Sequence, residues 1–281
     1  MPYKPSSQRS TERGFGLVEM LVSAALASIS LFAVSQFFIM QAKQQKGQGY
    51  RVEMQQALRS SLDAITRDLR LAGACLPSTG DFVAIDATNG AGTNPDSITV
   101  RAGIVRNDLS CIVTSLSALT QQGQTTLTVT SAAGFDVGML VYVRHPGGFG
   151  QFSFVTSAAG TNVVIADAAT QDYPVGSGLF AVDERVYRID TTVTPPQLLL
   201  TVNRAAPEAF AAGIPDLQFR YVLQQNCPPC DVVDLPPDDP TWRLVNEVLV
   251  TARASTVGAT RSEDQVSLTE TSRSKPRNLL P

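Results

Sequence analysis

The four cysteines are the residues of this chain with the widest choice of chemistry. Cys227 and Cys230 form a Cys-x-x-Cys pair, which could be a redox centre, half of a zinc site or a tight disulfide loop around two prolines. Redox catalysis would require a thioredoxin-like βαβ context, and the chain has no second Cys-x-x-Cys pair and only one histidine. We therefore expect structural disulfides. Of the three possible full pairings we favour Cys75 with Cys111 and Cys227 with Cys230.

The single histidine and one acidic loop are the other candidates for chemistry. His145 opens a glycine-rich segment, 145–150, which lacks the full dinucleotide-binding pattern, a nearby lysine for phosphate and a serine nucleophile elbow, so we expect a turn there. A proline-rich acidic stretch could offer oxygen ligands to calcium, but its spacing is not that of an EF-hand loop, and a solvated loop is favoured. Its aspartates are Asp231, Asp234, Asp238 and Asp239. The sequence thus predicts no catalytic residue, no bound metal and no cofactor.

Glu19 is the most unusual acid of the chain, because it is the only charge in a long apolar run. The run extends from Phe15 to Met40, before the first cation at Lys43. About 26 helical residues at about 1.5 Å each span roughly 39 Å, which exceeds the roughly 30 Å hydrocarbon core of a bilayer. The run therefore predicts one membrane-spanning helix. A carboxylate inside it costs about 2.5 to 3.5 kcal/mol, so Glu19 needs either a cation or a position at the headgroups.

The residues before the run form a basic leader. Segment 1–14 has three cations and one acid, which favours keeping this end in the cytoplasm while the chain crosses outward. An ordinary secretory signal places its cleavage site after the apolar region, whereas here the small residue Gly14 precedes it. Cleavage after Gly14 would leave the helix attached, create a new amine on Phe15 and change the net charge from −3 to −5. The bulk of the chain would then lie outside the cytoplasm, where disulfides persist.

Residues 14–22, GFGLVEMLV, resemble the class III leader junction of type IV prepilins and type II secretion pseudopilins. The resemblance implies that a prepilin peptidase cleaves after Gly14 and that Phe15 becomes an N-methylated mature N-terminus. It also implies that Glu19 pairs with the N-terminal amine of a neighbouring subunit during filament assembly. The chain differs from major pilins in having Gln36 and no proline in the membrane segment, so the proline-linked bend of those helices is not implied.

Hydrophobic periodicity predicts that the helix continues beyond the membrane segment. Apolar residues recur at steps of three or four, and Arg59, Asp63 and Arg67 fall on another face. The apolar positions are Met54, Leu58, Leu62, Ile65, Leu69 and Ala72. Gly47 and Gly49 could loosen the helix before this stretch, and Gly73 is suited to a C-cap. We expect four segments, namely a leader (1–14), a membrane or filament-core helix (15–42), an amphipathic helix (43–73) and a globular domain (74–281).

The globular domain carries β signals separated by turn residues. Alternating or short apolar runs predict strands at 96–101, 125–130, 141–143, 163–165, 182–189, 197–203, 217–223 and 245–253. The sequence VTSAAG occurs at 129–134 and again at 155–160, within a region, 119–180, that we interpret as a β-rich insertion. The expected fold class is α+β, a type IV pilin-like fold in which a long N-terminal helix packs on an antiparallel sheet domain.

The C-terminal half extends the resemblance. Segments 213–221 and 245–250, together with the helix end at 68–73, resemble the PilW type of minor pilin. That resemblance implies a structural subunit, not an enzyme, that helps to initiate a type IV pilus near its tip. The J-type pseudopilin of type II secretion shares the leader, helix and β domain and is the first alternative. A tip module that binds a surface or glycan through the insertion is the second.

The pilin resemblance also implies partners and a location. The partners would be other minor and major pilins, the prepilin peptidase, the inner-membrane assembly platform and a tip adhesin. The chain would span the inner membrane once, with its C-terminal domain in the periplasm, before it enters the extracellular pilus. The net negative charge gives no support for nucleic-acid binding.

Overall fold

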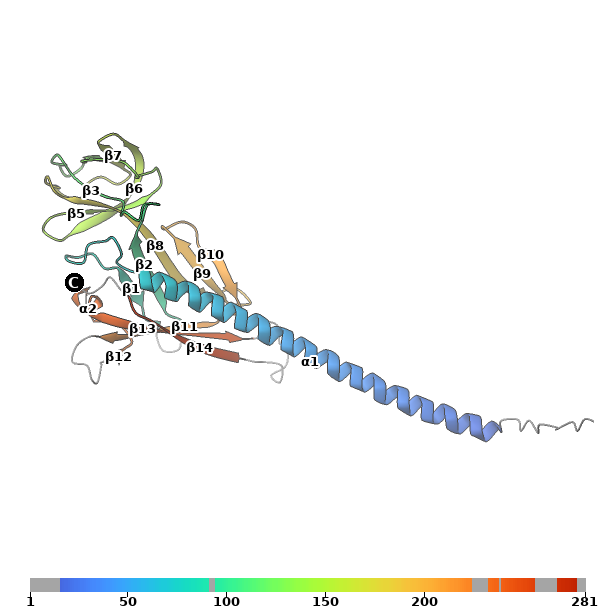
Figure 1. The fold of residues 1–281 in the computed structure, drawn as a ribbon. Coiled ribbons are helices and arrows are strands. Elements are labelled where there is room, and N and C mark those ends of the chain that lie inside the picture. Colours follow the sequence, from blue (N-terminus) through green and yellow to red (C-terminus); the bar gives the residue numbers. More distant parts are fainter. Residues whose placement is uncertain (1–15, 91–93, 224–231, 238, 256–266, 277–281) are drawn as a thin grey trace, which may run out of the picture. The chain divides into compact units, whose positions relative to one another are not determined.

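The computed structural model describes residues 16–90, 94–223, 232–237, 239–255 and 267–276. The chain divides into two compact units, Met1–Tyr50 and Arg51–Pro281. One helix, α1 (Leu17–Leu71), contributes to both units (Figure 1).

The described part of the first unit is the apolar portion of α1. Leu17–Ala42 is long and apolar enough to cross a membrane, and none of this segment is buried within the chain. Large side chains on every side of the helix are exposed, among them Leu17 and Phe32. The helix continues through Gly47 and Gly49 without interruption. Among the described residues of this unit, the apolar side chains of the helix are therefore open to their surroundings.

The second part of α1 carries the predicted amphipathic stripe. Arg59, Asp63 and Arg67 are exposed, while the apolar face is buried. The buried positions are Met54, Leu58, Leu62, Ile65, Leu69 and Ala72. Beyond the end of the helix, Gly73 has a φ of 78°, which suits glycine, and its N–H donates to the carbonyl oxygen of Arg101 at 2.9 Å.

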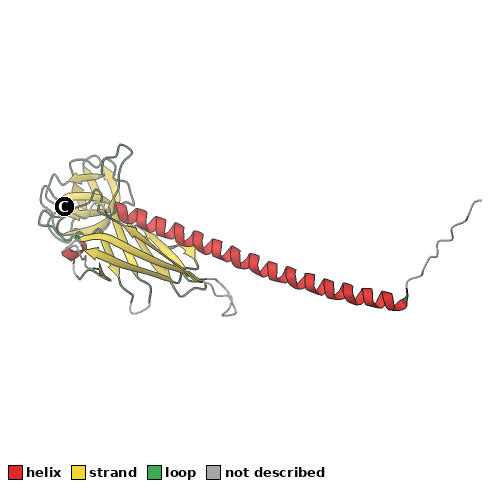
Figure 2. Cartoon of the chain, turned by 60° about the horizontal axis from the view of Figure 1, so that its bottom comes forward, coloured by secondary structure: helices red, strands yellow, loops and turns green. Residues whose placement is uncertain are grey.

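The rest of the second unit consists of antiparallel strands and one short helix, α2 (Asp239–Trp242). The strands are β1 (Ile85–Thr88), β2 (Ser97–Gly103), β3 (Val113–Ser115), β4 (Thr126–Thr128), β5 (Leu140–Arg144), β6 (Gly150–Ala159), β7 (Asn162–Ile165), β8 (Gly178–Asp190), β9 (Gln197–Val202), β10 (Glu208–Ala212), β11 (Asp216–Leu223), β12 (Val232–Val233), β13 (Val245–Ser255) and β14 (Ser267–Ser274). Figure 2 shows the strands grouped around the C-terminal part of the helix.

The two halves of strand β8 pair with different neighbouring strands. Its N-terminal half pairs with β3 on one edge and β5 on the other. Its C-terminal half pairs with β2 and β9, and β1 and β10 extend this part outward. One strand therefore connects the sheet that packs on α1 with a second structure built from β3 to β7.

That second structure is a closed barrel of β3, β8, β5, β6, β7 and β4. The ring closes where Leu116 pairs with Val129 and where Ser117 N–H donates to the Thr128 carbonyl oxygen at 2.9 Å. Its interior is filled by a separate apolar cluster that includes Leu127 and Tyr173. The barrel covers the expected insertion and begins before it, at β3. Because the ring is closed, these strands expose little unpaired backbone.

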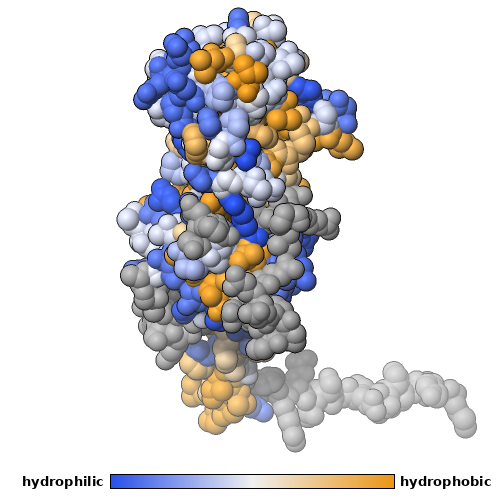
Figure 3. All heavy atoms as spheres, turned by 90° about the vertical axis from the view of Figure 1, so that its left-hand side faces the viewer, coloured by the Kyte–Doolittle hydropathy of each residue, from blue (hydrophilic) through white to orange (hydrophobic). Residues whose placement is uncertain are grey.

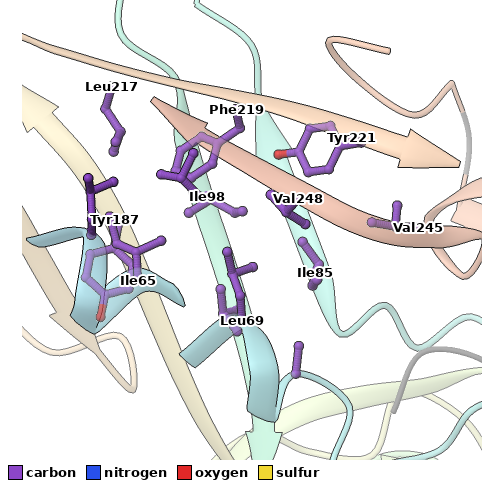
Figure 4. Close-up of a cluster of buried hydrophobic side chains, with 14 of the residues drawn as sticks. Ile65, Leu69, Ile85, Ile98, Tyr187, Leu217, Phe219, Tyr221, Val245 and Val248 are labelled. Atoms are coloured by element: carbon purple, nitrogen blue, oxygen red, sulfur yellow. The ribbon is translucent and has the colours of Figure 1, made fainter. Parts of the chain in front are cut away.

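The main core lies between α1 and the two sheets of the second unit. Figure 4 shows Ile65 and Leu69 of α1 together with side chains of β1, β2 and β8 and of the smaller sheet, β12-β11-β13-β14. Asp96 links the sheets, because its N–H donates to the Leu217 carbonyl oxygen and its Oδ2 accepts the Phe219 N–H, each at 2.8 Å. The fold is α+β, a long N-terminal apolar helix followed by antiparallel sheets, as predicted and consistent with a pilin-like fold.

Candidate functional site

Glu19 lies in the first turn of α1, at the end where the helix dipole is positive. The Gly16 N–H donates to its Oε2 at 3.4 Å, which is a long hydrogen bond. The described apolar segment from Gly16 to Ala42 contains no lysine or arginine. A full positive charge for this carboxylate must therefore come from outside that segment.

Three serines in the same segment donate hydrogen bonds to backbone carbonyl oxygens of the preceding turn. The Ser23 hydroxyl donates to the carbonyl oxygen of Glu19 one turn earlier. Ser28 and Ser30 donate to the carbonyl oxygens of Ala25 and Leu26, each at 2.8 Å. Hydroxyls that bond to the preceding turn are tolerated inside a membrane helix because no donor is left without a partner.

The other predicted assembly residues, Gly14 and Phe15, lie outside the described residues. Their roles in cleavage and methylation stay predictions. Of the predicted cysteines and acidic-loop residues, Cys227, Cys230, Asp231 and Asp238 also lie outside the described residues, so the second disulfide is not tested.

A second acid on α1, Asp68, anchors the helix to the sheet within the second unit. Arg185 Nη1 of β8 donates to both carboxylate oxygens, at 3.0 and 3.1 Å, and the Tyr187 hydroxyl donates to Oδ2 at 2.6 Å. Asp68 is 5% exposed, so its carboxylate is almost inaccessible to water and its negative charge is balanced mainly by Arg185. Sequence reasoning did not find this anchor, because its donors come from a strand more than a hundred residues away.

The anchor changes the ionisation of its partners. Burial disfavours the charged guanidinium of Arg185, but the carboxylates of Asp68 and Asp183 outweigh that effect and raise its pKa. Burial, together with the hydrogen bond to Asp68, also raises the pKa of Tyr187. The carboxylate is therefore held by a charged arginine and a neutral tyrosine across the ordinary pH range.

The disulfide between Cys75 and Cys111 is present, with a Cα–Cα distance of 5.6 Å, as favoured from the sequence. It joins the segment just after α1 to the hairpin that leads into the barrel. A side chain at Gly103 would bring a Cβ within 2.6 Å of the Cys75 Cβ, so this glycine lets β2 pass close to the disulfide. The crosslink therefore fixes the end of the helix against the strands.

His145 and the described acidic residue Asp234 take part in local structure. The His145 ring stacks on Phe149 at 4.2 Å, and its Nδ1 accepts the Gly147 N–H at 2.8 Å, so the glycine-rich segment is the β5–β6 turn. Asp234 forms an exposed ion pair with Arg220 at 3.1 Å. Within the parts of the chain that the structure describes, no three histidine, cysteine or acidic residues are grouped to hold a metal ion.

The leader region matches a protein-family model. Residues 9–35 match the family described as the prokaryotic N-terminal methylation motif. No curated protein matches the chain. The match includes Gly14, Phe15 and Glu19, and it supports a subunit of the type IV pilin or pseudopilin class. Subunits of this class are generally processed by a prepilin peptidase and associate with other pilins.

Proposed function

We propose that this chain, with its N-terminal methylation motif, is a minor pilin of the PilW type, a non-catalytic subunit that helps to assemble a type IV pilus near its tip. The observation that carries the proposal is Glu19, an acid without a cation in its apolar segment, placed in the first helical turn directly after the matched leader junction. The anchored β domain supports it, because the same helix is fixed to a folded unit.

In the proposed mechanism, processing of the N-terminus is followed by assembly of the helix into the filament. Before assembly, the helix (15–42) spans the inner membrane, with the globular domain in the periplasm. A prepilin peptidase cleaves between Gly14 and Phe15, and the new amine is methylated. The amine of a neighbouring subunit then pairs with Glu19, which relieves the cost of an uncompensated carboxylate, about 2.5 to 3.5 kcal/mol, and sets the axial register of the packed helices.

The test is substitution of Glu19 in cells that assemble the filament. We expect Glu19→Gln to leave cleavage and membrane insertion intact and to lower recovery of the chain in sheared filaments about tenfold or more. Losing about 1.4 kcal/mol of pairing energy between Glu19 and the neighbouring amine is enough for a tenfold change in the assembly equilibrium. Glu53→Gln, an exposed acid on the second part of the same helix, is the matched control. Equal recovery of Glu19→Gln and wild type would reject the mechanism.

A deletion strain separates the pilus from the secretion machine. Loss of the chain should lower the number of surface pili and leave export through a type II secretion system unchanged. Lost secretion with normal pili would assign the chain to the J-type pseudopilins instead.

A further inference from the structure

The barrel carries fewer charged side chains than the rest of the chain. Residues 113–180, all of which the structure describes, contain four charged residues in 68 positions, whereas charged residues make up 17% of the whole chain. The four are Asp136, Arg144, Asp167 and Asp172. A soluble surface usually has about 25 to 35% charged residues. The barrel is kept hydrophilic mainly by uncharged side chains, and it shows pale surfaces of intermediate hydropathy beside hydrophilic and hydrophobic patches in the upper part of Figure 3.

Uncharged side chains form a continuous outer face on β3, β4, β7 and β6. Residues of these strands alternate between the barrel interior, where Leu127 and Val163 are buried, and the outside. We name the outward set the hydroxyl face, and it consists of Ser115, Ser117, Thr126, Thr128, Thr130, Ser157, Ala159, Asn162 and Val164. Strand β7 lies opposite β8 in the ring, so the face is directed away from the strand shared with the main sheet (Figure 1).

The strand register places the side chains of the hydroxyl face in rows. Thr128 pairs with Asn162 of β7, and Thr126 pairs with Val164 one row further along. Ser157 of β6 in turn pairs with Val164. Neighbouring strands lie about 4.8 Å apart, and alternate residues of one strand lie about 6.7 Å apart. The face is therefore a regular array of short side chains on a closed barrel.

Most polar side chains of the hydroxyl face have unused hydrogen-bonding capacity. The hydroxyls of Ser115 and Thr130 share a hydrogen bond at 3.2 Å. The other polar side chains form no hydrogen bond with any residue that the structure describes, and they are Ser117, Thr126, Thr128, Ser157 and Asn162. Hydroxyls and carboxamides both donate and accept. Because these side chains are short, and threonine is stiff at χ1, a ligand would order them at a small cost in entropy.

The composition of the hydroxyl face restricts the kind of molecule that it can bind. Its residues include no lysine or arginine, which nucleic acids and anionic lipids require. They also include no aromatic residue or methionine, which are enriched at the centres of protein interfaces, whereas serine and alanine are depleted there. The donors and acceptors of the face match a molecule that is rich in hydroxyl groups and has no net charge.

We propose that the hydroxyl face binds a neutral polysaccharide, whose hydroxyl groups exchange hydrogen bonds with those of the barrel. A polysaccharide chain repeats at regular intervals and can contact several rows at once, whereas a small ligand needs a concave pocket. This inference is independent of the proposed function, because the barrel closes within one chain and presents the same face in a pilus or a pseudopilus. Binding attaches the subunit to a carbohydrate surface.

The experiment is co-sedimentation of the full-length chain with insoluble cellulose and with starch granules, in a polyoxyethylene detergent that has no sugar headgroup. Wild type should sediment with at least one of the two polysaccharides. Raising the salt concentration about tenfold should leave the bound fraction unchanged, because neither surface is charged. The double variant Thr126→Val with Thr128→Val removes two hydroxyls and keeps the β-propensity, so it should bind at least about fivefold more weakly at an unchanged thermal unfolding midpoint.

Two further variants control for the position and for the hydroxyl group. Thr269→Val, at an exposed threonine of strand β14 outside the barrel, should bind like wild type. The double variant Thr126→Ser with Thr128→Ser keeps both hydroxyls and should also bind like wild type.

Other outcomes overturn the inference. Absence of wild-type binding to both polysaccharides, or equal binding by wild type and the valine double variant, would show that the face does not bind carbohydrate. Weaker binding together with a lowered unfolding midpoint would show a structural role for the two threonines. Binding that disappears at high salt would assign it to charged groups elsewhere in the chain. Loss of a copurifying pilin subunit from the valine double variant, with unchanged polysaccharide binding, would reassign the face to a protein contact.

Discussion

Two acids on helix α1 have opposite environments. Asp68, in the second unit, is buried against β8, and the charge and hydroxyl that it needs are supplied by Arg185 and Tyr187 of the same chain. Glu19, in the first unit, lies in an apolar segment without a cation, and the side chains around it are exposed. The comparison separates two roles of the helix, because Asp68 completes the fold of a single chain and Glu19 is proposed to pair with a second molecule.

The apolar surfaces of the helix differ in the same way. In the second unit the stripe from Met54 to Ala72 is covered by strands, whereas none of Leu17–Ala42 is buried by the residues that the structure describes. Substitutions in the two regions should therefore differ in kind. Those near Asp68 should change stability, and those near Glu19 should change assembly.

The largest expected effect on stability is that of Asp68→Ala. It leaves Arg185 partly buried without its main partner and the Tyr187 hydroxyl without an acceptor, which should lower the free energy of unfolding by about 3 kcal/mol. Urea denaturation of the full-length chain in detergent measures this. Asp63→Ala, on the exposed face of the same helix, should change it by less than about 0.5 kcal/mol, as should Glu19→Gln. Equal midpoints for Asp68→Ala and wild type would remove the distinction between the two acids.

A smaller effect on stability is expected from Glu184, a buried acid that forms ion pairs with Arg101 and Arg204 of the same chain. Burial alone would raise its pKa, but the hydrogen bonds from Arg101 and Arg204 outweigh burial and lower it. A lowered folded-state pKa contributes stability above the unfolded pKa of about 4.3, and this stability is lost as the pH falls through the folded value.

The measurement is the free energy of unfolding of wild type and Glu184→Gln between pH 6 and pH 3. Wild type should lose more stability than the variant as the pH falls below about 4, because only wild type has the carboxylate that becomes protonated. Parallel curves for the two chains would show that Glu184 contributes no pH-dependent stability.

The sequence predicted what depends on local periodicity. The buried stripe of α1, the end of the helix before Gly73 and strands such as β2 and β11 follow from spacing and composition, and the structure confirms them. The favoured Cys75–Cys111 pairing is present as well. The helix and the strands follow from patterns that span only a few neighbouring residues. The disulfide could be favoured because four cysteines allow only three full pairings.

Other features depend on contacts that no local pattern records. Strand β14 is a polar alternation, and β3 has three residues, so neither gives a hydrophobic signal, although β3 closes the barrel. The Asp68 anchor requires the register between α1 and β8. Of the candidate assembly site, Glu19 could be found from sequence because a charge in an apolar run is visible there.

The most direct test of the central claim is mass spectrometry of the mature N-terminus of the chain isolated from membranes and from sheared filaments. The account predicts a chain that starts at Phe15, carries one methyl group on its α-amine and lacks residues 1–14. A mature chain that starts at any other residue would contradict it, because Glu19 would then lie at the wrong distance from the N-terminal amine with which it is proposed to pair.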